Sequence, residues 1–181
     1  MTDALPADPL ISLRPWDAPE VTSWGRLPMN AVDRRPGALS LDGDWRFQLL
    51  SAPDAPVGGS WGSSYVPGVW TLQGTDDLPQ YTNVRMPFPD FPPGSPAANP
   101  TGVYERAVDV PADWAGRRIV LQVGAAESVL LVHVDGRPVG ISKDSRLAAE
   151  FDLTAHVRAG ERAVVRLTVV KWSDATHIED Q

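Results

Sequence analysis

The second half of the sequence is a series of short segments rich in apolar residues, with turn residues between them. These segments are residues 103–110, 118–123, 129–134, 138–142, 151–153 and 163–172. Asp135-Gly136, between the third and the fourth, is a strong signal for a two-residue hairpin turn. Short strands at regular spacing predict an all-β fold, an antiparallel β-sandwich, and no long amphipathic helix competes with that prediction.

The first half of the domain is less regular. Residues 45–49 alternate as a half-buried strand would, and residues 65–70 predict a second short apolar strand, interrupted by a Pro-Gly pair. Residues 71–102 form a long Pro-rich segment without a period, and a compact domain rarely carries such a loop without a use for it. Single helical turns are expected at residues 112–115 and 147–149.

Residues 1–38 lack sustained periodicity and contain six prolines, each of which removes a backbone donor. We therefore expect an extended N-terminal arm, followed by the sandwich domain over residues 39–181. Trp16 and Trp24 in the arm indicate that it docks on the domain or on a partner subunit. The sequence stops directly after a polar loop, so we expect the sandwich to be truncated at its C-terminal end and to expose an edge.

Composition excludes several classes of function. The chain has no cysteine, which excludes disulfides and cysteine-based metal sites or nucleophiles. Its net charge of −7 argues against a nucleic acid partner, because phosphate binding needs a basic surface. The first residues do not resemble a signal peptide, and no segment approaches the roughly 20 apolar residues that span a bilayer. We expect a cytoplasmic protein without a membrane partner.

Several short motifs occur in an order and at spacings that chance explains poorly. They are Arg14-Pro15-Trp16, the segment 41–47 (LDGDWRF), 66–70 (VPGVW), 81–84 (YTNV), 99–104 (NPTGVY), 144–147 (DSRL), 150–153 (EFDL), 171–174 (KWSD) and 179–181 (EDQ). With these motifs the chain resembles the bacterial β-galactosidases of glycoside hydrolase family two. The segments 41–47 and 66–70 are shared with the β-glucuronidase and β-mannosidase relatives, whereas 81–84, 99–102 and 172–181 are typical of β-galactosidases.

The resemblance implies a jelly-roll, galactose-binding-domain-like sandwich that forms the N-terminal sugar-binding domain of a larger enzyme. It also implies a TIM barrel with two catalytic glutamates about 5 Å apart, a retaining pair. Since the barrel lies outside these 181 residues, no residue here is assigned a catalytic role, and the isolated chain is expected to be inactive. The implied substrates are terminal β-D-galactosides such as lactose. A homotetramer and Mg²⁺ are implied only for the full-length enzyme and its catalytic domain.

Asp174 is the first candidate site residue. By resemblance, the Asp of the Trp-Ser-Asp motif reaches the active site, where it binds galactose and a sodium ion (Na⁺). A carboxylate can ligate a hard cation and accept hydrogen bonds from sugar hydroxyls. The alternative is a turn after the long strand, where Ser-Asp is common. Ala175 to His177 depart from the Gly and aromatic residue that relatives often have here, which leaves the shape of this loop open.

Asn83 is the second candidate. The resemblance implies that the Asn of Tyr-Thr-Asn-Val contacts galactose, and an amide can both donate to and accept from a hydroxyl. The alternative is a loop Asn that bonds its own backbone. His133 and His156 are interpreted as structural residues, and His177 as a solvated loop residue that could also touch a ligand.

Two alternatives to the β-galactosidase interpretation stay open. The first is a stand-alone, non-catalytic carbohydrate-binding β-sandwich, which the length and the seven tryptophans permit. The second is the N-terminal domain of a β-glucuronidase or β-mannosidase, against which the motifs at 81–84 and 172–174 weigh.

Overall fold

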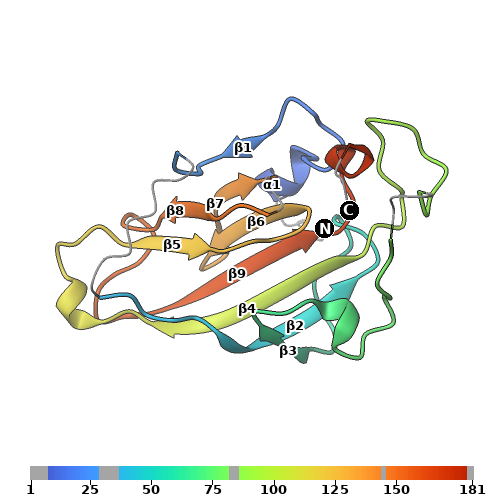
Figure 1. The fold of residues 1–181 in the computed structure, drawn as a ribbon. Helices are drawn as coiled ribbons and strands as arrows, with labels where there is room; N and C mark the ends of the chain where they lie inside the picture. Colours follow the sequence, from blue (N-terminus) through green and yellow to red (C-terminus); the bar gives the residue numbers. More distant parts are fainter. Residues whose placement is uncertain (1–7, 29–36, 82–85, 144–145, 179–181) are drawn as a thin grey trace, which may run out of the picture.

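The computed structural model describes residues 8–28, 37–81, 86–143 and 146–178 (Figure 1). Its strands are β1 (Ser23–Trp24), β2 (Gly43–Leu50), β3 (Gly62–Val66), β4 (Thr101–Asp109), β5 (Val120–Val123), β6 (Val129–Val134), β7 (Arg137–Ser142), β8 (Ala149–Asp152) and β9 (Arg162–Val170). Its short helices are α1 (Pro9–Ser12), η1 (Trp70–Leu72), η2 (Ala112–Trp114) and η3 (Asp174–His177).

Seven strands form one antiparallel sheet in the order β1-β7-β6-β9-β4-β2-β3, and β5 pairs with β8 in a second, two-stranded sheet. The main apolar core joins the two sheets: Leu121 on β5 and Phe151 on β8 belong to the same buried cluster as side chains of β2, β4, β6 and β9. Phe151 packs so closely over β7 that only a glycine, Gly140, fits beneath its ring. The predicted all-β, antiparallel sandwich is confirmed.

All six residues of β6 are buried, which is unusual for an antiparallel strand with one face toward solvent. Leu130, Val132 and Val134 join the main core. Val129 and Leu131 point to the opposite face, where they form a second apolar cluster. The continuous run VLLVHV is therefore explained by burial of both faces of the strand.

The N-terminal arm forms the cover of that second cluster. Leu10 of α1 and Trp16 pack on Val129, Leu131 and Ile141, and each of the two is at most 2% exposed. Asp8 caps α1 by accepting from the Leu10 amide at 2.9 Å, and Pro9 occupies the first helical position, where its missing N–H costs nothing. Figure 1 shows α1 and β1, in blue, beside β7.

The sequence predicts an extended arm over residues 1–38, and the part of it that the structure describes is not extended throughout. The arm contains one helical turn, α1, and its strand β1 extends the sheet by pairing Ser23 with Ser142. His133, interpreted from the sequence as structural, is buried under the arm with Nε2 2.9 Å from Asp8 Oδ2. The tryptophans of the arm predicted that it docks on the domain, and the burial of Trp16 against the sheet shows that it does.

Two further expectations differ from the structure. The strand expected at residues 65–70 ends at Val66, because Pro67 has no N–H to continue the ladder, and the chain then enters η1. A helical turn is expected at residues 147–149 but is not found at these described positions. Ala149 instead begins β8 and pairs with Val123. The turn at 112–115 is found as η2.

The hairpin turn at Asp135-Gly136 is confirmed. Both residues have positive φ angles, 49° and 72°, which fits the mirror-image turn that suits the twist of a hairpin. None of the helices in the described ranges is long and apolar enough to cross a bilayer.

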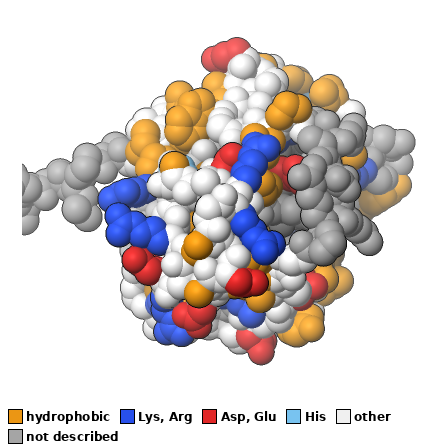
Figure 2. Space-filling view, turned by 90° about the vertical axis from the view of Figure 1, so that its left-hand side faces the viewer, with side chains coloured by type: hydrophobic (Ala, Val, Ile, Leu, Met, Phe, Trp, Pro, Cys, Tyr) orange, Lys and Arg blue, Asp and Glu red, His pale blue; other side chains and the backbone are white. Residues whose placement is uncertain are grey.

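The end of the sandwich at the left of Figure 1 carries charged residues of both signs. Figure 2 looks onto this end, where blue and red side chains are interleaved. The Arg162–Asp109 ion pair lowers the pKa of Asp109, and hydrogen bonds from Thr154 and Arg118 lower that of Asp152 to about 2. Paired charges therefore cover this end of the two sheets.

Candidate functional site

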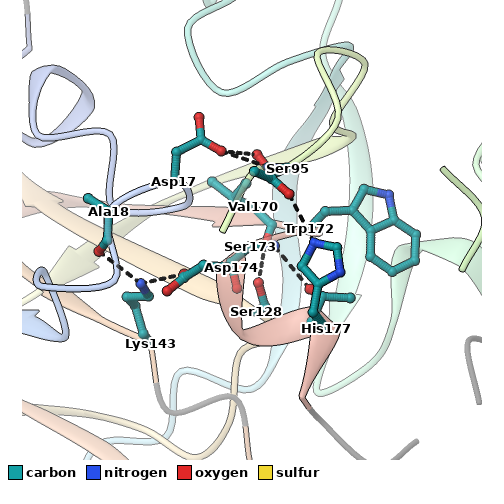
Figure 3. A network of polar contacts seen from close by, with 12 residues as sticks. Asp17, Ala18, Ser95, Ser128, Lys143, Val170, Trp172, Ser173, Asp174 and His177 are labelled. Carbon is teal, nitrogen blue, oxygen red and sulfur yellow. Dashed lines mark hydrogen bonds and ion pairs between the residues drawn. The ribbon is translucent and has the colours of Figure 1, made fainter. Parts of the chain in front are cut away.

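Strand order brings the candidate site together. β6 lies between β7 and β9 and is antiparallel to both. β7 and β9 therefore run in the same direction, and their C-terminal ends lie at the same end of the sheet. Lys143 directly follows β7, and Asp174 follows β9 by four residues. The arm reaches the same edge at residues 16–18, and Figure 3 shows the polar contacts among these three segments.

Asp174 forms an ion pair with Lys143 in a largely closed environment. Lys143 Nζ lies 2.5 Å from Asp174 Oδ1, and the two side chains are only 8% and 13% exposed. The angle of the contact between Lys143 Nζ and Asp174 Oδ1 does not suit a hydrogen bond. The main interaction is therefore the attraction between the two opposite charges. Lys143 also donates to the carbonyl of Ala18 at 3.2 Å. The second oxygen, Oδ2, makes no hydrogen bond with the residues that the structure describes.

The backbone around Asp174 is fixed as well. Its amide donates to the Trp16 carbonyl at 2.8 Å. The hydroxyl of Thr176 accepts from the Ser173 amide at 3.0 Å and so closes the first turn of η3. Asp174 therefore begins a short helix with a defined cap and does not lie in an irregular loop.

A buried asparagine holds the chain between β9 and η3. Asn99 donates to the Trp172 carbonyl at 2.8 Å and accepts from the Trp172 amide at 2.9 Å. Trp172 lies beyond the end of β9, so its backbone N–H and C=O have no partner among the neighbouring strands that the structure describes. Asn99 is only 1% exposed, and its side chain satisfies both groups where water does not reach them. The Asn-Pro-Thr-Gly motif thus sets the path of the chain toward Asp174.

Asn83 lies outside the described residues, but both flanks of its segment are attached close to Asp174. On one side, Asp77 accepts from Lys171 Nζ at 2.7 Å and from the indole of Trp70 at 2.6 Å. On the other side, the ring of Phe88 packs edge-on against Trp172, with centroids 5.3 Å apart. The Asp77–Lys171 ion pair is largely buried, with side chains 9% and 13% exposed.

The segment that follows Asn83 also borders a depression of the surface. Met86, Pro87, Phe88 and Pro89 line it. Phe88 lies 5.6 Å, edge-on, from the ring of His177, and His177 Nε2 is 3.0 Å from the Gly94 carbonyl. His177 is therefore half-buried and held by the Pro-rich segment, which corrects its interpretation as a solvated loop residue.

Asp17 of the arm holds the same Pro-rich segment. Its Oδ1 accepts from the Ser95 amide at 2.9 Å and from the Ser95 hydroxyl at 2.5 Å. Partial burial raises the pKa of this carboxyl, but the bonds from Ser95 and Arg14 outweigh burial and place the pKa below its ordinary value. Asp17 is thus a charged acceptor under neutral conditions.

The donor set can be compared with the sodium ion that the resemblance implies. No three His, Asp or Glu side chains gather within metal-binding reach anywhere in the described ranges. Asp174 alone offers a hard carboxylate oxygen, Oδ2, while Lys143 already balances the charge at Oδ1. The residues that the structure describes could therefore supply one carboxylate ligand to such an ion, and no more than one.

The sequence predicted Asp174 as a candidate but did not indicate Lys143, Asn99 and Asp17, which hold Asp174 or the chain around it. Each acts across a large sequence separation: Lys143 and Ala18 are 125 positions apart, and Asp17 and Ser95 are 78 apart. Only the Asn-Pro-Thr-Gly motif carried a usable signal, since Asn99 belongs to it. The strand order that joins the other residues is not visible in local patterns.

Comparison with known proteins agrees with this architecture. The β-galactosidase of Psychromonas ingrahamii is 37% identical over 194 positions, covering 95% of this chain and 19% of that protein. The β-galactosidase of Arthrobacter sp. strain B7 is 39% identical over 170 positions, covering 80% and 17%. The chain therefore spans about a fifth of the length of the curated relatives it matches.

Solved structures give the same fold. A β-glucuronidase of Faecalibacterium prausnitzii superimposes with a TM-score of 0.55 at 27% identity, over 72% of this chain and 20% of that one. Residues 38–181 match the profile of the family described as glycosyl hydrolases family 2, sugar binding domain. Since this match covers most of the sequence, the chain belongs to family 2 of the glycosyl hydrolases and contains the family's sugar binding domain.

Proposed function

We propose that this chain supplies part of the galactose site of a retaining β-galactosidase, with Asp174 and Asn83 as sugar ligands and Asp174 also as a ligand of Na⁺. The relatives named above are β-galactosidases and extend well beyond the matched region. In this proposal the hydrolytic step belongs to a separate catalytic domain, and the residues of this chain bind and orient the sugar.

The observation that carries the proposal is the convergence of two segments. The stretch with Asn83 is anchored to Lys171 and Trp172, which stand directly before Ser173 and Asp174. Asn83 is five residues from Phe88, so an extended chain allows a separation of at most about 18 Å. This limit allows Asn83 to come near Trp172 and Asp174, and an amide and a carboxylate that both contact one sugar can bind neighbouring hydroxyls.

The test is a titration of the isolated chain with galactose, followed by NMR at the Asp174 and Phe88 amides. We expect weak, saturable shifts that Asp174→Asn abolishes, because the amide lacks the charge that accepts strongly from hydroxyls. Asp90→Asn changes an exposed carboxylate beside the same depression and is the matched control. Shifts that persist in Asp174→Asn contradict the proposal.

The isolated chain is also expected to show no hydrolysis of a nitrophenyl β-galactoside. Turnover that survives rigorous purification, and that Asp174→Asn reduces, would contradict the assignment of chemistry to another domain. Tight galactose binding, in the micromolar range, would instead favour a stand-alone carbohydrate-binding module.

A β-glucuronidase domain is the second candidate, favoured by the Faecalibacterium structure. Glucuronate carries a carboxylate, which the charge of Asp174 would repel at short range. We therefore expect glucuronate to shift the Asp174 amide less than galactose does. The reverse order would favour the glucuronidase alternative.

A further inference from the structure

Three consecutive residues of the arm each bind a different segment of the candidate site. The Trp16 carbonyl accepts from the Asp174 amide at 2.8 Å. The carboxylate of Asp17 accepts from Ser95 twice. The Ala18 carbonyl accepts from Lys143 Nζ at 3.2 Å. Figure 3 shows Asp17 beside Ser95 and Ala18 beside Lys143, which in turn lies beside Asp174.

The position of this tripeptide is fixed independently of the site. The Trp16 side chain is buried with Leu10 in the cluster on the outer face of β6, β7 and β9. A buried indole loses much apolar contact if it moves, so the carbonyls beside it stay in place relative to the sheet. The arm thus holds Asp174 at a fixed distance from the sheet on which Trp16 packs.

Asp174 is attached to the tripeptide through both its backbone and its side chain. The amide bonds Trp16 directly, whereas Oδ1 is connected through the Lys143 ammonium to Ala18. Lys143 therefore engages one carboxylate oxygen, and the other makes no hydrogen bond with the residues that the structure describes. Without these attachments the side chain of Asp174 could adopt other rotamers and point away from this direction.

We propose that the arm segment 16–18 is a positioning element of the sugar site, which holds the Asp174 carboxylate in one direction by fixing its amide and, through Lys143, one of its two oxygens. Asp17, Lys143 and Trp16 act here through Asp174 and are not themselves ligands. The functional part of this inference rests on the proposed role of Asp174, while the structural part does not need a sugar.

Hydrogen exchange of the full 181-residue chain, resolved at single amides by NMR, tests the structural part. Asp17→Ala removes the Ser95 attachment, and we expect the Asp174 amide to exchange at least five-fold faster. Lys143→Met is expected to have the same effect at Asp174. Amides in the centre of β9, such as Val165, should keep their exchange rates because the sheet does not depend on Asp17.

Two variants separate positioning from general destabilisation. Asp17→Asn keeps an oxygen that can accept from Ser95, so it should restore slow exchange at Asp174. Arg14→Ala removes the exposed ion pair with Asp17 but none of the three attachments, and should leave exchange at Asp174 unchanged. Unchanged exchange at Asp174 in Asp17→Ala, or equal acceleration at Asp174 and Val165, overturns the proposal.

A galactose titration of the same variants tests the functional part. Asp17→Ala is expected to weaken the galactose response at least three-fold, and Asp17→Asn to recover it. Normal binding in Asp17→Ala overturns the positioning role even where exchange is faster. If the unmodified chain gives no response that depends on Asp174, the proposed sugar role fails while the exchange result still reports on the attachment of the arm.

Discussion

At the scale of single residues, the path of the chain toward Asp174 depends on side chains that replace ladder hydrogen bonds. β9 ends at Val170, and the Lys171 amide then bonds the Pro100 carbonyl. Beyond that point Asn99 takes over both backbone groups of Trp172. A side chain that satisfies one buried donor and one buried acceptor is costly to replace, because both are left unpaired.

Asn99→Ala is therefore expected to lower the free energy of unfolding by about 3 kcal/mol, since two buried backbone groups lose their partners. Urea denaturation followed by tryptophan fluorescence measures the change. Gln122→Ala on β5, where the side chain is exposed, serves as the control and should change stability by less than about 0.5 kcal/mol. Equal effects of the two variants would refute this role of Asn99.

Gly140→Ala is expected to destabilise the sandwich by about 2 kcal/mol through overpacking. A Cβ at this position would lie 2.5 Å from the Phe151 ring and 2.7 Å from the Trp24 carbonyl. Gly124→Ala adds the same methyl group where no atom lies within 4 Å. The difference in thermal midpoint between the two variants measures the effect, and a similar midpoint for both would show that the sheets adjust freely.

At the scale of elements, β6 and the arm depend on each other. β6 has apolar side chains on both faces, and the arm supplies the cover of the face that the β5–β8 sheet does not reach. Alternation in the sequence predicted most strand positions, because it reports which face of a strand is buried. The ends of β3 and the arm helix α1 were not predicted, since they depend on a proline and on tertiary packing.

Trp16→Ala is expected to cost about 4 kcal/mol of stability, the usual range for an emptied tryptophan site in a core. Trp24→Ala, in the same arm but 49% exposed, is the matched control and should cost less than about 1 kcal/mol. Urea denaturation gives both values. A small loss in Trp16→Ala would mean that the arm adds little to the second cluster.

At the scale of the whole molecule, the candidate site combines segments that only the complete sheet brings together. Asp174 followed from the family resemblance, but its partner Lys143 did not, because the parallel arrangement of β7 and β9 follows from strand order. The two-sheet fold followed from strand spacing alone. Asn83 stays a prediction based on its motif and on the anchoring of its flanks.

Stability of the whole molecule should depend on pH in the acid range. The pKa of Asp152 is lowered to about 2 by Thr154 and Arg118, so its stabilising effect is complete above pH 4 and is lost as the pH falls toward 2. After allowance for solvent screening, this carboxyl contributes about 1 kcal/mol. The urea midpoint should be flat from pH 7 to 5 and then fall.

Asp152→Asn should reduce that acid dependence and lower stability at pH 7. Asp54→Asn, at an exposed position, is the control and should leave the acid slope unchanged. An acid slope that is the same in Asp152→Asn and in the unmodified chain would show that other carboxyls account for it.

The arm is bonded to Lys143 and Asp174, which come late in the sequence, and this has a consequence for biosynthesis. Ala18 leaves the ribosome 125 residues before Lys143, its partner. At about 5–20 residues per second, roughly 6–25 s pass before that partner is made. For most of this time neither of the strands on which Trp16 packs, β6 and β9, has been made. The arm is thus translated well before the strands on which it packs, and it reaches its native place only after they are made.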